Sequence, residues 1–126
     1  MSLITQKSPS SVEETVQKIS SEIEQKGLKI FSTIKHGEAA QSNGLELDPT
    51  TLIIFGNPQV GTKLMQCDQR MGLELPMKIL VWQDANGDVF SGFRNPEEYQ
   101  DHYNLTDCAE VVQKVKGVMS SLIGKV

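Results

Sequence analysis

The segment Gly56–Lys63 has the residue types closest to a phosphate-binding loop. Its two glycines have the spacing of the Walker A motif, and it follows an apolar run that is typical of a buried strand. That motif needs lysine before the hydroxyl residue, because the lysine reaches the outer phosphates and the hydroxyl binds magnesium. Here Thr62 precedes Lys63, and Pro58 removes one backbone N–H from the loop. A nucleotide triphosphate site is therefore disfavoured, and a turn between a strand and a helix is the simplest interpretation.

A weaker form of anion binding stays open for the same segment. Backbone amides at a helix N-terminus, together with a nearby lysine, can hold a small anion without the full motif. We therefore take Asn57, Gly61, Thr62 and Lys63 as candidate ligand-binding residues, with a small anionic ligand as the possible partner. Asn57 taken alone is also a common turn former.

Two other residues are candidates for catalysis. His36 stands at the end of an expected strand and could act as a general base, with Lys78 as an electrostatic stabiliser. A hydrogen-bonded structural histidine is the simpler interpretation of His36, and His102 is expected at the surface. The sequence leaves open whether the protein is an enzyme.

Metal sites are disfavoured by the spacing of their possible ligands. His36–Glu38 matches half of a zinc deaminase signature, but the cysteine half is missing. A structural zinc site would need ligands from four distant places, because the chain has two histidines and two separated cysteines. Asp84–Asp88 resembles the start of a calcium loop, yet the glycine and glutamate of an EF-hand are misplaced. No metal and no cofactor is predicted.

The two cysteines, Cys67 and Cys108, are predicted to be free thiols. They form no C-x-x-C motif, and the first residues lack the basic start and apolar core of a signal peptide. Two distant cysteines in a chain without an export signal are most often reduced. The expected localisation is cytoplasmic.

Charge and hydropathy exclude two classes of partner. The net charge is −4 and the lysines are scattered, whereas a nucleic-acid binder normally carries a basic patch. The longest apolar runs have four residues, far short of the roughly 20 that cross a bilayer. A chain of 126 residues can build one hydrophobic core. Neither nucleic acid nor a membrane is an expected partner, and residues 1–126 are expected to form a single domain.

The elements that must position these residues follow from periodicity and capping signals. A capping box at Ser11 and apolar residues at helical spacing predict a helix that ends at Gly27, and the last helix starts near Asp107. Gly117 inside the last helix indicates close packing there. Alternation and turn signals predict the strands, and Asn86-Gly87 predicts a tight hairpin. The expected strands are 3–7, 28–35, 50–55, 77–83 and 89–93, with short helices at 62–70 and after Asn95.

Strand 77–83 is apolar on both faces. Alternation sends Ile79 and Val81 one way and Leu80 and Trp82 the other. The two long helices can cover one face of the sheet, so a partner is expected over the second face. We predict a homodimer. The alternative is that the segments 36–43 and 62–70 fold over this face.

One set of segments covers residues 27–31, 34–36, 44–47, 49–58, 61–65 and 73–82. In the sequences, order and spacing of these segments, the chain resembles the domain of unknown function 302 family of bacteria and archaea. The resemblance implies a fold like that of TATA-binding-protein domains, with strand, helix, four strands and helix. Family members usually have aspartate before the histidine, where this chain has Lys35, so a site that needs an Asp–His pair is in doubt.

The expected fold is therefore α+β and two-layered, with a mainly antiparallel sheet of about five strands and two long helices on one face. The family has no established catalytic residues to carry over, and a fold alone carries no function. The leading hypothesis is a binding or interaction module for a small anionic ligand or a protein partner. The alternative hypothesis is an enzyme that uses His36 and Lys78.

Overall fold

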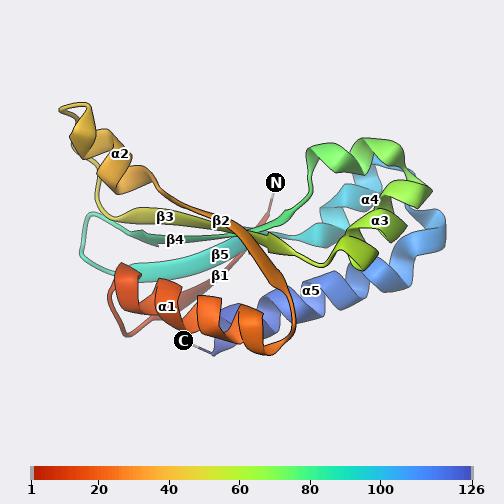
Figure 1. Ribbon diagram of the computed structural model, residues 1–126, viewed down its shortest axis with the longest axis horizontal. Coiled ribbons are helices and arrows are strands. Elements are labelled where there is room, and N and C mark those ends of the chain that lie inside the picture. The colour runs from red at the N-terminus through yellow and green to blue at the C-terminus, as the bar shows by residue number, and fades with distance from the viewer. Residues whose placement is uncertain (1, 126) are drawn as a thin grey trace.

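The computed structural model describes residues 2–125 (Figure 1). Its strands are β1 (Leu3–Ser8), β2 (Lys29–Lys35), β3 (Thr50–Gly56), β4 (Met77–Gln83) and β5 (Val89–Arg94). Its helices are α1 (Val12–Gln25), α2 (His36–Ser42), α3 (Pro58–Cys67), α4 (Tyr99–His102) and α5 (Ala109–Gly124). Three 3₁₀ segments join them: η1 (Gln69–Leu73), η2 (Pro96–Glu98) and η3 (Thr106–Cys108).

The strands form one antiparallel sheet in the order β1-β5-β4-β3-β2. Helices α1 and α5 lie on the same face of this sheet, and α2 projects away from one end of it (Figure 1). Helices α3 and α4 gather at the other end. The predicted α+β fold with two long helices on one face is confirmed. We call the face away from α1 and α5 the open face.

The helix α1 forms where its capping signals and apolar spacing place it. The Ser11 hydroxyl accepts a hydrogen bond from the Glu14 amide at 3.1 Å. The apolar stripe of the helix is buried against the sheet, with Ile19 and Ile23 fully covered. The helix ends before Gly27, whose φ of +75° is a conformation that glycine adopts at no steric cost.

Alternation along the central strands separates the core from the open face. Ile53, Phe55, Ile79 and Val81 are completely buried on the helix side. Their neighbours along the chain, such as Leu80, point to the open face and are half-buried. The central strands therefore carry apolar side chains on both faces of the sheet, as predicted.

The strand β2 departs from the predicted alternation. Ile30 pairs with Phe55, but the next paired residue is Ser32, opposite Ile54, so Phe31 forms a bulge. Regular alternation along the predicted strand 28–35 would place Ile30 and Ile34 on one side of the sheet, but they lie on opposite sides. The bulge moves Ile34 to the open face, where it pairs with Leu52 and is 38% exposed.

The prediction of two free thiols is also wrong. Cys67 at the end of α3 and Cys108 before α5 form a disulfide, with their Cα atoms 6.5 Å apart. They are separated by 41 positions in the sequence, but the folding of β4 and β5 returns the chain to the same end of the sheet. Sequence distance was thus a poor guide to distance in space. Disulfides are typical of oxidising compartments, so the cytoplasmic localisation stays a prediction that this bond weakens.

The prediction of close packing at Gly117 is wrong as well. A Cβ atom added at Gly117 would meet no atom within 4 Å. The close approach occurs instead at Gly92 in β5, where an added Cβ would lie 3.0 Å from Thr5 Cγ2 and 3.3 Å from Trp82 Cη2.

Candidate functional site

The ladder between β4 and β5 is shorter than the ladders on either side of it. It ends at the pair Leu80–Gly92. By contrast, β3 pairs with β4 as far as Met77, and β1 pairs with β5 as far as Arg94. The strands β4 and β5 therefore separate beyond Leu80.

A cavity of about 810 Å³ lies at this separation. Its walls on the open face include Leu52, Leu80 and Trp82. Further walls come from β5 and from α5 on the opposite side of the sheet, namely Phe93, Val112, Val115 and Met119. Since both sets of residues line one cavity, the cavity runs from the open face between β4 and β5 toward α5. Its volume lies in the range of sites that bind small molecules.

Two cations and one carboxylate stand at the rim of this cavity. Arg94 Nη1 donates to Glu74 Oε1 at 2.9 Å. Lys78 Nζ donates to the carbonyl oxygens of Glu74 and Pro76, at 3.1 and 2.9 Å. Partial burial lowers the pKa of Lys78 from its ordinary value. An ammonium has three N–H groups, so one donor of Lys78 remains for a further acceptor.

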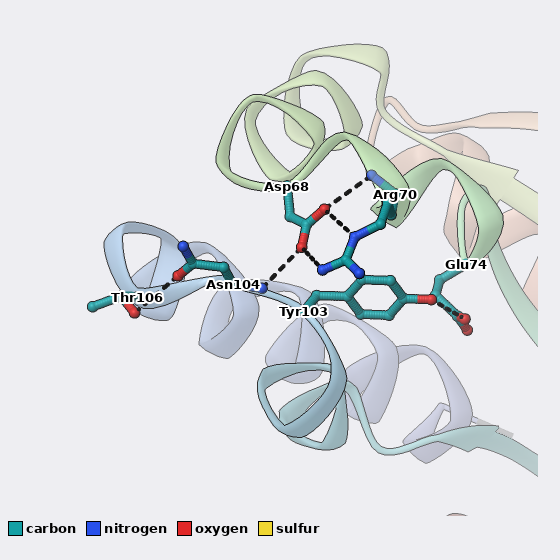
Figure 2. A network of polar contacts seen from close by, with 6 residues as sticks. All are labelled: Asp68, Arg70, Glu74, Tyr103, Asn104 and Thr106. Atoms are coloured by element: carbon teal, nitrogen blue, oxygen red, sulfur yellow. Dashed lines mark hydrogen bonds and ion pairs between the residues drawn. The ribbon is translucent and has the colours of Figure 1, made fainter.

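A polar network holds Glu74 in place (Figure 2). The Tyr103 hydroxyl donates to Glu74 Oε2 at 2.8 Å, and this hydrogen bond raises the pKa of Tyr103. The Arg70 guanidinium lies over the Tyr103 ring, 5.7 Å from its centroid. Both Glu74 oxygens are thus bonded, to Arg94 and Tyr103, while Lys78 is held by carbonyl oxygens.

Asp68 anchors the same network from the end of α3. It accepts hydrogen bonds from the Arg70 side chain at 2.8 and 3.1 Å and from the Asn104 amide at 2.9 Å (Figure 2). These bonds, that from Arg70 first, hold the pKa of Asp68 well below its usual range. The network thus ties η1, which carries Glu74 at its end, to the segment after α4.

The residues predicted from the phosphate-loop pattern lie elsewhere. The short helix predicted at 62–70 begins earlier than expected, because α3 starts at Pro58, with the Asn57 side chain accepting from the Gln59 amide at 2.9 Å. The Gly61 amide donates to the Asn57 carbonyl at 3.0 Å. This amide belongs to the first turn of the helix ladder, so it is not available to an anion.

Three of these four residues do line a second, smaller cavity, of about 330 Å³. Asn57, Gly61 and Thr62 contribute to its wall, while Lys63 is exposed outside it. The rest of the wall is almost entirely apolar: Phe31, Pro58, Val60, Leu64, Met65, Leu75, Pro76, Met77 and Val115, with two glycines. Its chemistry does not match the predicted anion.

The two catalytic candidates are not brought together. His36 is exposed and follows Lys35, which lies level with Val81 across β3. Lys78 lies three residues from Val81 along β4, so roughly 14 Å separates the backbone of Lys78 from that of Lys35, and His36 is one residue further away. A reaction that uses both side chains on one bond is disfavoured by this placement.

Sequence reasoning missed Glu74, Arg94, Tyr99 and Tyr103, which accompany Lys78 at the rim or support it. Their signal in the sequence was weak, because they come from four different elements or connections. Among residues 2–125, no three His, Cys, Asp or Glu side chains gather in the way that a metal ion requires. No helix in the same range has the length and apolar character to cross a membrane.

A family model described as "Domain of unknown function DUF302" matches residues 4–122. The chain belongs to the DUF302 family. The crystal structure of an uncharacterized conserved DUF302 protein from Bacillus stearothermophilus has the same fold as this domain. The TM-score is 0.89 at 21% identity, over 99% of this chain and 98% of that one.

This DUF302 domain is also similar to parts of larger curated proteins. It is 38% identical over 112 residues to the fluoride-specific ion channel FluC 1 of Brucella suis biovar 1, covering 89% of this chain and 44% of that protein. The FluC 2 protein of Brucella melitensis biotype 1 is equally similar, with 42% of its length covered. The domain thus spans less than half the length of these relatives.

Proposed function

We propose that this DUF302 domain is a binding module for a small anionic ligand, which it holds in the large cavity at Lys78. The observation that carries the proposal is a lysine with a spare N–H donor at the rim of a mostly apolar cavity. Glu74 pairs with Arg94 and accepts from the Tyr103 hydroxyl, so both of its oxygens already have a partner other than Lys78. Cavities of this size with a few converging polar groups are typical of ligand sites.

The ligand class is the one predicted from the sequence, but the proposed binding residue is Lys78 in place of the segment 56–63. The segment 56–63 offers few spare amides, since Asn57 caps α3 and Gly61 is in the helix ladder. Lys63 lies outside the adjoining cavity. Lys78, first considered as an electrostatic stabiliser, becomes the main ligand-binding residue.

An NMR titration tests the site. Amide spectra are recorded with acetate, phosphate or fluoride at millimolar concentration, for the wild type, Lys78→Met and Lys63→Met. Fluoride is included because the curated relatives carry the name of fluoride channels. We expect saturable shifts at residues 74–80 and 92–99 that Lys78→Met abolishes and Lys63→Met leaves. Shifts at 56–64 that depend on Lys63 would instead support the site predicted from the sequence.

We also propose that the open face is covered by a second copy of the chain. Apolar side chains surround the mouth of the cavity, with Leu3 59%, Leu47 47% and Leu73 81% exposed. Exposed apolar patches of this kind usually mark interfaces. A dimer would close the cavity and exclude water from it. Light scattering at micromolar concentration distinguishes a dimer from a monomer.

A further inference from the structure

We infer that the ligand of this cavity is amphipathic, with one anionic head and an unbranched apolar tail, as in a medium-chain carboxylate. This inference rests on the proposed function of the same cavity and goes further by assigning a place to each part of the ligand. The head lies at Lys78, and the tail passes between β4 and β5 toward α5.

Charged residues are unevenly distributed along the cavity. The charged residues in its wall are Asp48, Glu74, Lys78 and Arg94. Asp48 stands beside Leu47, in the connection before β3, and the other three form the rim described above. None of the residues that α5 contributes to the wall is charged: they are Val112, Val115 and Met119. The cavity is thus polar at its mouth and apolar at its inner end.

The strands β4 and β5 leave an opening between them. A continuous antiparallel ladder would place a hydrogen-bonded sheet between the rim and α5. Here the β4–β5 ladder ends at Leu80–Gly92, so Met77 and Phe93 line the cavity from two strands that have separated. A narrow, unbranched chain suits an opening of this kind.

A purely polar anion fits this cavity poorly. A small ion such as phosphate would satisfy Lys78 but leave most of the 810 Å³ without a partner. The apolar wall stabilises a ligand in proportion to the apolar surface that the ligand buries. Each added methylene is therefore expected to tighten binding about fourfold until the inner wall is reached.

A fluorescence titration measures this dependence on length. Trp82 is the single tryptophan of the chain and lines the cavity, so its emission reports on occupancy. Hexanoate, octanoate and decanoate are compared below their micellar concentrations. Decanol and decyltrimethylammonium test the head group, because they keep the tail and remove or reverse the charge. We expect affinity to rise about fourfold per methylene, with decanoate at least tenfold tighter than either control. Equal binding of all three ten-carbon probes would overturn the role given to the head group.

Methionine methyl NMR locates the tail without any substitution. Met119 lines the large cavity, Met65 lines the smaller one, Met77 lines both, and Met71 is buried elsewhere in the core. Decanoate is expected to shift the methyl signals of Met77 and Met119 and to leave that of Met71 unchanged. Shifts at Met65 without Met119 would place the tail in the smaller cavity and overturn the inference.

A matched pair of variants separates this inference from the proposed function. Lys78→Met should weaken decanoate at least tenfold while decanol binding stays within threefold, and Lys114→Met on the exposed side of α5 should change neither. Suppose that acetate binds at Lys78 but affinity does not depend on chain length and the Met119 methyl signal does not shift. The inference about the tail is then wrong, and the proposed function stands. If no anion of any length binds at Lys78, both are wrong.

Discussion

Lys78 carries its charge at a cost to the fold. Burial lowers the pKa of this lysine, so its charged form is less favourable in the folded state than in the unfolded chain. The group's contribution to stability is therefore most favourable above its unfolded pKa near 10.5 and declines as the pH falls through the folded pKa. A residue that binds a ligand often costs stability in this way.

Replacing Lys78 by methionine should separate binding from stability. The side chain loses two hydrogen bonds to carbonyl oxygens but also loses an unfavourable charge. Because the residue is largely exposed, we expect the free energy of unfolding to change by less than about 1 kcal/mol. Urea unfolding at neutral pH measures this change. A loss of several kcal/mol would show that Lys78 is structural.

Asp68 makes stability sensitive to acid. Its hydrogen bonds from Arg70 and then from Asn104 lower its pKa in the folded state, so the unfolded chain takes up the proton first as the pH falls. Its stabilising effect is present above the unfolded pKa near 3.8 and is lost as the pH falls through the lower folded pKa. The wild type should therefore lose more stability between pH 5 and pH 2 than Asp68→Asn does. Urea midpoints across this range test it, with the exposed Asp101→Asn as control; parallel curves for wild type and Asp68→Asn would contradict it.

Two glycines should respond to alanine in opposite directions. At Gly92 the added methyl would lie 3.1 Å from the Ile4 carbonyl oxygen and push against Trp82, which we expect to cost about 1–3 kcal/mol. At Gly117 in α5 the methyl meets open space, and the variant should gain about 0.5–1 kcal/mol. Thermal unfolding with Trp82 emission compares the two. A stabilised Gly92→Ala would contradict the close approach of β1 and β5.

At the scale of elements, the disulfide ties α3 to the start of α5. A covalent link across 41 residues reduces the conformational freedom of the unfolded chain. We expect its removal, in the double variant Cys67→Ala, Cys108→Ala, to lower the free energy of unfolding by about 2–4 kcal/mol. Thiol labelling of the denatured wild type without reductant should find no reactive cysteine. Two labels per chain would contradict the disulfide.

Some elements follow from local sequence and others do not. β3, β4 and α1 were predictable because apolar residues recur at the period of a strand or a helix. An Asn–Pro pair begins a helix at Asn57 and a 3₁₀ turn at Asn95. At Asn57 the helix was not predicted from the start, because Gly61 four residues later suggested a turn. The bulge at Phe31 has no compositional signal, because it depends on register against β3.

The candidate site was less predictable than the fold. Lys78 could be selected from the sequence because it is a polar position within the segments that resemble the family. Glu74, Arg94 and Tyr99 reach the same rim only through the pairing of β4 with its neighbours and the turn after β5. The disulfide and the separation of β4 from β5 likewise depend on long-range packing. Periodicity within a single segment carries no information about either.

At the scale of the whole molecule, the proposed homodimer depends on the apolar side chains of the open face. Ile34 reaches this face through the bulge in β2 and is partly exposed. We expect a homodimer at micromolar concentration, and Ile34→Glu should shift it at least tenfold toward monomer, because a carboxylate would be buried in the interface. Ser120→Glu on the exposed side of α5 is the matched control. Light scattering measures the molar mass of the wild type and of both variants. A monomeric wild type would contradict the dimer.

The disulfide has a consequence for damage to the chain. The segment between Cys67 and Cys108 contains β4, β5, α4 and every residue of the polar rim, so these residues lie in one covalently closed ring. The exposed hairpin turn at Ala85–Gly87 is the kind of site where proteases nick folded proteins. A nick at this turn would leave both fragments attached to each other through the sulfur bridge. The nicked molecule could therefore keep its cavity and survive as an intact species until a reductant releases the fragments.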